Sequence, residues 1–301
     1  MRATRFVMLS TVLAAVGCGG MEADTQDSVD AQPTGRGGGL VSEMAKPSNQ
    51  AGIGNVTNHG GPIMTGTKTI YYIWYGNWSG NNASTILNAF ANGIGGSPYF
   101  NINSTYTNST GGKVDNSVVF GGSTTVAYPY GTALTDANIQ SIVADSINTG
   151  AFPLNTNAVY FVLTSADVNE TSGSSGFCTS FCGWHNHGTI NGADIKYSFV
   201  GNPDRCITSC AAQSIGPNGN AGADGMVSIL AHELEEAATD PNLNAWYDLQ
   251  GYENGDKCAW TFGTQSTAAN GAKYNITLGG LPMLIQQNWE KTAKVCKMSY
   301  P

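Results

Sequence analysis

The chain has 301 residues, of which only 11% are charged, and its formal net charge is −8. Its 13 basic residues form no stripe that could neutralise a phosphate backbone, which excludes nucleic acid as a partner. The low charge content, together with many Gly, Asn, Ser and Thr residues, is typical of an exported protein with a neutral surface.

The first 18 residues predict an export signal. "MRATRF" carries two arginines, "VMLSTVLAAV" is an apolar run too short to span a bilayer, and Gly17 and Cys18 follow. A cysteine after small residues resembles a bacterial lipobox, so we expect lipidation of Cys18, with a plain signal peptide as the alternative. The predicted product is an outer-membrane or cell-surface lipoprotein, or a secreted protein, that meets the membrane only through an anchor at Cys18.

Residues 19–50 predict a flexible linker. They include "DTQDS", "PTGRGGG" and "KPSNQ" and have almost no apolar periodicity, so they cannot bury enough surface to offset the entropy lost on ordering. Residues 51–301 are long enough for one sizeable core. We therefore expect a single globular domain over 51–301.

Four segments of this domain predict strands. "TIYYIWYG" (69–76) and "NAVYFVLT" (157–164) are unbroken β-branched and aromatic runs, the pattern of strands buried on both faces. Two short strands are expected near 118–128. "IKYSF" (195–199) alternates in the manner of an edge strand.

Three segments predict helices. Residues 82–96 and 135–150 place apolar side chains at helical spacing and end in glycine, and Thr135 is the expected cap of the second helix. The third helix is expected to begin at Asp224 and to end before Pro241.

The third helix contains the motif "HELEE". His232 and Glu236 are four residues apart, so both side chains project from one face, as two ligands of a zinc ion must. Glu233 occupies the position at which H-E-x-x-H enzymes keep the general base that activates water. The motif therefore predicts His232 and Glu236 as metal ligands and Glu233 as the catalytic base.

A third metal ligand is expected downstream of this helix. Glu253 in "GYENGDKC" is the first choice, because related motifs take a glutamate at a comparable distance. Asp256 and Asp240 are expected either to bind the metal or to orient His232, and Asp248 is a further option.

Two histidines upstream form the pair H-x-H in "CGWHNHG". On a strand His185 and His187 would point to one side, and we take His185 as the reserve ligand. A structural role for the pair is the alternative.

Residues 232–256 hold seven of the 21 acidic residues and no Lys or Arg. Acidic side chains this close together must be stabilised by a bound cation, by a hydrogen-bond network or by exposure to solvent. Calcium is the alternative to zinc and would use oxygen ligands without His232. The simplest alternative is that the acidic residues form a solvent-exposed polar face of the helix. The oxygen ligands open to calcium are Glu236, Asp240, Glu253 and Asp256.

Six cysteines remain besides Cys18, an even set that predicts disulfides in an exported chain. Two C-x-x-x-C units could instead hold structural zinc, but an oxidising compartment disfavours this. Tight local loops favour three pairs among the possible arrangements: Cys178 with Cys182, Cys206 with Cys210, and Cys258 with Cys296.

The alternation of strands and helices predicts an α/β or α+β fold. We expect a single domain with a mixed sheet, about three main helices and a short-stranded C-terminal part held by disulfides. By analogy alone, an edge strand that leads to a metal-binding helix suggests a zincin-like domain.

Several phrases are shared with a known family. They are "HGGPIMTG" (59–66), "IWYGNW" (73–78), "FCTSFCGWH" (177–185), "FVGN" (199–202), "GADGM" (222–226) and "AATDP" (237–241). Together they resemble the phosphate-induced protein/EXORDIUM family, known mostly as plant extracellular proteins linked to growth. The resemblance covers 58–247 and implies an exported, disulfide-bonded domain at the cell surface, but no particular mechanism.

Two functions follow from the sequence as hypotheses. The first is an exported metal-dependent hydrolase, most simply a zinc peptidase, that acts on a peptide or a cell-surface polymer. The second is a non-catalytic domain that binds cell wall, carbohydrate or protein, with calcium or no metal in the acidic cluster.

Overall fold

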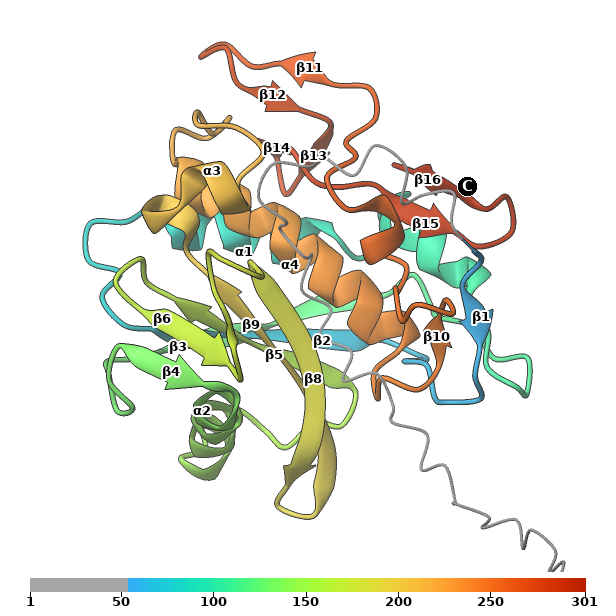
Figure 1. Ribbon diagram of the computed structural model, residues 1–301, viewed down its shortest axis with the longest axis horizontal. Helices are drawn as coiled ribbons and strands as arrows, with labels where there is room; N and C mark the ends of the chain where they lie inside the picture. The colour runs from blue at the N-terminus through green and yellow to red at the C-terminus, as the bar shows by residue number, and fades with distance from the viewer. Residues whose placement is uncertain (1–53) are drawn as a thin grey trace, which may run out of the picture. The chain divides into compact units, whose positions relative to one another are not determined.

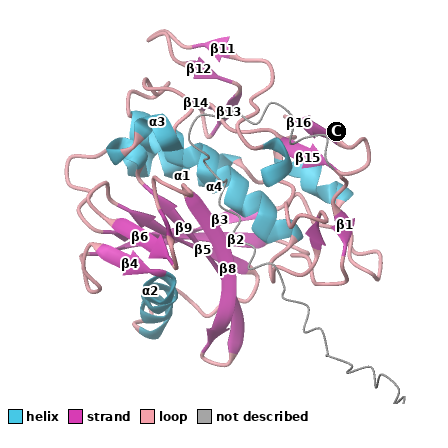
Figure 2. Cartoon of the chain, viewed as in Figure 1, coloured by secondary structure: helices cyan, strands magenta, loops and turns pink. Residues whose placement is uncertain are grey.

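The computed structural model describes residues 54–301 (Figure 1). The predicted export signal, the linker and the lipidation of Cys18 lie outside the described residues. The described part is a mixed α/β structure, as predicted, and Figure 2 shows helices on both sides of a central sheet. Within this part of the chain, no helix has the length and apolar character needed to cross a bilayer.

The central sheet has five strands in the order β3-β2-β5-β9-β8. Four of them are parallel: β3 (Val118–Val126), β2 (Lys68–Tyr75), β5 (Ala158–Thr164) and β9 (Ala193–Gly201). The edge strand β8 (Gly183–Ile190) runs antiparallel to β9. Strands β2 and β5 are almost entirely buried, because helices cover both faces of the sheet.

Two strand predictions are corrected. β3 is one continuous strand rather than two. Its pairing with β2 shifts register between Ile70 and Tyr71, where the extra residue Gly121 forms a bulge in β3 and has no side chain to meet the Tyr71 ring. β9 is internal rather than an edge strand, because β8 pairs along its outer side.

Three longer helices pack on this sheet (Figure 1). α1 (Ala83–Gly93) and α4 (Ala221–Thr239) lie on one face, and α2 (Asp136–Asn148) lies on the other. Thr135 caps α2 in a capping box, as predicted. α4 packs against β8, β9 and α1, and its residues are buried all round.

The expected start of α4 is wrong by about one turn. Its cap is Asn220, whose side chain accepts a hydrogen bond from the amide of Ala223 at 3.0 Å. Asp224 lies inside the helix and accepts hydrogen bonds from the backbone and side chain of Asn218. An asparagine is as good a cap as an aspartate, so the sequence alone did not separate the two.

The remaining elements are short. The other helical segments are η2 (Phe100–Thr105), η3 (Pro203–Arg205), α3 (Ile207–Cys210) and η4 (Asp256–Cys258). The other strands form small sheets: β1 (Thr57–Asn58) with β10 (Trp246–Tyr247); β4 (Ala133–Thr135) with β6 (Asn169–Ser172) and β7 (Ser175–Gly176); β11 (Ser266–Thr267) with β12 (Lys273–Tyr274); β13 (Ile276–Leu278) with β14 (Leu281–Met283); and β15 (Asn288–Glu290) with β16 (Val295–Lys297).

All six cysteines of the described part form disulfides, but only one expected pair is present. Cys258 pairs with Cys296, as predicted. The two local pairs are wrong, because Cys178 bonds Cys206 and Cys182 bonds Cys210. The two C-x-x-x-C segments lie side by side, so each cysteine pairs across the gap and joins the start of β8 to α3.

We expect the double variant Cys258→Ala/Cys296→Ala to lose about 2–4 kcal/mol of unfolding free energy. The bridge closes a separation of 38 residues, and its removal frees the unfolded chain. Denaturant unfolding of the two proteins measures the difference. An unchanged midpoint would contradict the prediction.

Candidate metal centre

The centre is built on α4, where His232 and Glu236 lie one turn apart. His232 Nε2 is 3.0 Å from Glu236 Oε1, yet this contact lacks the geometry of a hydrogen bond. Both side chains are buried, at 1% and 0% exposure. The two groups therefore point at a common position without satisfying each other.

The chain beyond α4 returns to this face through the segment Glu253–Asp256. The amide of Asp256 donates to Glu236 Oε1 at 3.0 Å, and Asp256 Oδ1 lies 3.5 Å from His232 Nε2. The return is close because residue 255 is glycine: a Cβ there would lie 2.9 Å from Glu236 Oε1. The expectation that the downstream acids fold back onto α4 is confirmed.

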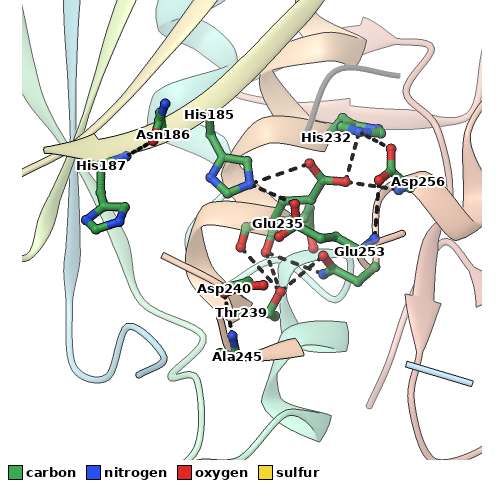
Figure 3. A network of polar contacts seen from close by, with 12 residues as sticks. His185, Asn186, His187, His232, Glu235, Thr239, Asp240, Ala245, Glu253 and Asp256 are labelled. Atoms are coloured by element: carbon green, nitrogen blue, oxygen red, sulfur yellow. Dashed lines mark hydrogen bonds and ion pairs between the residues drawn. The ribbon is translucent and has the colours of Figure 1, made fainter. Parts of the chain in front are cut away.

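Strand β8 contributes His185, which contacts the other carboxylate oxygen of Glu236 from the one that His232 contacts (Figure 3). Its Nε2 shares a hydrogen bond with Glu253 Oε2 at 3.1 Å and lies 3.7 Å from Glu236 Oε2. His187 does not join this cluster, because its Nδ1 contacts Asp194 at 2.7 Å. The first histidine of the H-x-H pair therefore belongs to the centre and the second does not.

Two sets of potential ligands result. His185, Glu236 and Glu253 form one set, and His232, Glu236 and Asp256 form the other. Within each set the ligand atoms lie within 4.8 Å of one another. The sequence analysis predicted Glu253 as the ligand beside His232. In the structure Asp256 lies beside His232, and Glu253 lies beside His185.

Glu233 stands next to these sets. Its side chain is fully buried, and neither carboxylate oxygen has a hydrogen-bond partner among the described residues. It packs against Gly183 of β8, where a Cβ would lie 3.2 Å from Glu233 Oε1. Burial raises the pKa of Glu233 well above its usual range, with His232 opposing and Glu236 adding to the effect.

The protonation states follow from burial and from the neighbouring charges. Burial lowers the pKa of His185 to about 4, so its ring is neutral, as a metal ligand requires. Burial also opposes protonation of His232, but Glu236 and Asp256 outweigh it and raise the pKa well above its usual range. Burial raises the pKa of Glu236 and of Glu253, and neighbouring carboxylates add to both shifts.

The other acids of this region have partners of their own. Asp240 accepts hydrogen bonds from the amides of Asn244 and Ala245 at 2.6 and 2.7 Å and so ends α4. Asp248 forms a buried salt bridge with Lys257 at 2.6 Å. Neither acid belongs to a ligand set, although Asp240 Oδ2 is buried without a hydrogen-bond partner among the described residues.

Glu235 is also outside the two sets and accepts from the side chain of Asn288. The sequence analysis missed this partner, because nothing in the local pattern links α4 to β15. It also missed Gly183 and Gly255, whose missing side chains let β8 and the return segment approach α4.

The fold and the centre define a disulfide-bonded α/β protein with a buried histidine–carboxylate cluster. The conserved region of phosphate-induced protein 1 matches residues 56–299. The chain therefore belongs to the phosphate-induced protein 1 family, as the resemblance in sequence indicated.

Several plant proteins are similar to this chain. Protein EXORDIUM-like 5 of Arabidopsis thaliana is 31% identical over 85% of this chain and 81% of its own length. Protein EXORDIUM-like 3 of the same plant is 30% identical over 79% and 81%. Protein PHOSPHATE-INDUCED 1 of Nicotiana tabacum is 26% identical over 69% and 71%. No solved structure matches the chain.

Proposed function

We propose that this protein is an exported metal-dependent hydrolase, most simply a zinc peptidase. His232, Glu236 and Asp256 would hold the zinc ion, and Glu233 would be the general base. The observation that carries the proposal is the buried, unpartnered carboxylate of Glu233 beside a convergent set of one histidine and two carboxylates. Zinc accepts nitrogen and carboxylate ligands of this kind.

The chemistry would need a zinc ion held by His232, Glu236 and Asp256 and, from the protein, Glu233 as the base. A zinc ion lowers the pKa of a bound water to about 7. Glu233 would accept a proton from the attacking water as the water oxygen adds to the substrate carbonyl carbon, and would then pass the proton to the leaving amine. The bond between carbon and nitrogen breaks, and the products are an acid and an amine.

The arrangement of α4 and β8 supports this assignment by analogy. An antiparallel edge strand lies beside the motif helix, as in zincin-like domains, and an extended peptide can add to such an edge. A peptide or another cell-surface polymer is therefore the proposed substrate class.

Metal analysis of protein purified without chelator tests the proposal. We expect stoichiometric zinc and hydrolysis of an unstructured protein such as casein, with loss of activity on chelation and recovery with zinc. Protein that contains no zinc and gains none on addition would overturn the proposal.

A non-catalytic cell-surface binding domain is the second candidate. The full burial of Glu233 and Glu236 favours it, because structural metal sites are closed whereas catalytic sites keep a position open. Calcium in the oxygen ligands would leave His232 uninvolved. A His232→Ala variant with unchanged metal affinity and melting temperature would select this candidate over zinc.

Gly255→Ala should weaken metal binding about 10–100-fold without removing a ligand. The added methyl group would lie 2.9 Å from Glu236 Oε1 and 3.1 Å from the His232 ring, so the return segment and Asp256 must shift. Competition with a zinc chelator measures the affinity. Gly176→Ala is the matched control, since its nearest neighbour is a hydroxyl at 3.2 Å, outside the centre. Equal affinities of the two variants would contradict the prediction.

A further inference from the structure

Glu236 turns its two carboxylate oxygens toward different histidines. Oε1 lies 3.0 Å from the Nε2 of His232, and Oε2 lies 3.7 Å from the Nε2 of His185. Each side is completed by one further carboxylate, from Asp256 and from Glu253. Glu236 is the only residue that the two ligand sets share.

The spacing within each set suits an ion. Two donors at about 2.1 Å from a tetrahedral ion lie roughly 3.4 Å apart. The distances from His232 Nε2 to Glu236 and Asp256 are 3.0 and 3.5 Å, and those from His185 Nε2 to Glu253 and Glu236 are 3.1 and 3.7 Å. In each set, one distance is shorter and the other is longer than the separation expected for two ligand atoms of one ion.

Buried polar atoms without hydrogen-bond partners lie on both sides of Glu236. Glu236 Oε2, Glu253 Oε1 and His232 Nε2 are buried and have no hydrogen-bond partner among residues 54–301. Buried polar atoms in native proteins are normally paired, and an unpaired one calls for an explanation such as an ion. On the His185 side, His185 Nε2 and Glu253 Oε2 share a hydrogen bond at 3.1 Å. Glu236 Oε2 and Glu253 Oε1 have none, so a single ion on the His232 side would leave these two oxygens unexplained.

The negative charge of the buried carboxylates also favours bound cations. Glu233, Glu236, Glu253 and Asp256 bring four carboxylates into the interior, and the basic side chain nearest in sequence, Lys257, is held by Asp248. Burying carboxylates without a counter-charge is strongly unfavourable. Divalent cations bound between these carboxylates would reduce this cost, and His232 would then bind as a neutral ring.

We propose that the centre is dinuclear: two divalent metal ions of the zinc class, bridged by the carboxylate of Glu236. His232 and Asp256 complete the first site, and His185 and Glu253 complete the second. Carboxylate-bridged metal pairs lie about 3.5–4 Å apart and can bind both the attacking and the leaving group of a hydrolysis. This inference rests on the proposed metal-dependent function and adds the second ion and its ligands.

The test is the metal content of the full chain and three variants, measured after loading with zinc and desalting. We expect two zinc ions per chain in the native protein, one in His185→Ala, one in His232→Ala, and none retained in Glu236→Ala. His187→Ala is the matched control on β8 and should keep two. Circular dichroism confirms that each variant is folded.

Spectroscopy of the metal-exchanged protein provides a second readout. The native protein loaded with Mn²⁺ should show the electron paramagnetic resonance of a spin-coupled pair, whereas His185→Ala should show isolated ions. One ion per chain that is lost in His232→Ala but kept in His185→Ala would overturn the dinuclear centre and leave the proposed hydrolase intact. One ion lost in both variants would show a single shared site and would also overturn it. No ion in any protein would overturn both proposals.

Discussion

Replacing Glu233 with glutamine is expected to slow hydrolysis about 10²–10⁴-fold while the metal content stays unchanged. The amide has nearly the shape of the carboxylate but cannot accept a proton from water. Because Glu233 belongs to neither ligand set, its replacement removes the base without removing a metal ligand. Steady-state rates on a peptide substrate and metal analysis of the same preparation measure the two quantities.

The change should also stabilise the protein slightly or leave its melting temperature unchanged. A buried carboxylate without hydrogen-bond partners costs more free energy than a neutral amide in the same place. Glu235→Gln is the matched control, because Glu235 lies on the same helix, is equally buried, and accepts from Asn288 outside the centre. A similar loss of rate in both variants would show that Glu233 has only a structural role.

The buried strands and helix ends could be predicted because local patterns determine them. The apolar runs of β2 and β5 have no polar face, so only a doubly covered sheet accommodates them. Thr135 is followed by Asn138, which completes a capping box within one turn. These features depend on residues close in sequence.

The position of β8 could not be predicted, because its sequence "GWHNHGTI" lacks an apolar run. It becomes a strand by pairing with β9, and that pairing places His185 against α4. The two local disulfide predictions failed for the same reason, since Cys178–Cys206 and Cys182–Cys210 depend on two segments meeting in space. Tertiary contact decided both outcomes.

The candidate site was predictable in its helical half alone. His232 and Glu236 follow from i, i+4 spacing, which a helix fixes. The partners from the return segment depend on a loop, and several acids had a suitable distance in sequence. Gly255 contributes to the outcome, because a side chain there would crowd Glu236 and keep the amide of Asp256 from approaching it.

Lys257→Met should lower the free energy of unfolding by about 3–5 kcal/mol, because it leaves a buried charge without its counter-ion. Lys257 Nζ lies 2.6 Å from Asp248 Oδ2, and the two side chains are 1% and 0% exposed. Asp248 would keep only the amides of Gln250 and Tyr252, at 2.9 and 3.0 Å, as donors. Methionine retains the apolar stem, so the loss reports the charge rather than a cavity. Denaturant unfolding measures the difference.

The double variant Lys257→Met/Asp248→Asn separates the charge from the packing. Asparagine can still accept from the two backbone amides but carries no charge, so the double variant should be more stable than Lys257→Met alone. Buried ion pairs often contribute little net stability, yet removing one partner is costly. Lys257 lies next to Asp256, so loss of the pair should also loosen the return segment and weaken metal binding. If the single and double variants were equally stable, the charge on Asp248 would not be the source of the loss, and the role of Lys257 would reduce to its packing against Trp289, whose ring centroid lies 5.7 Å from its Nζ.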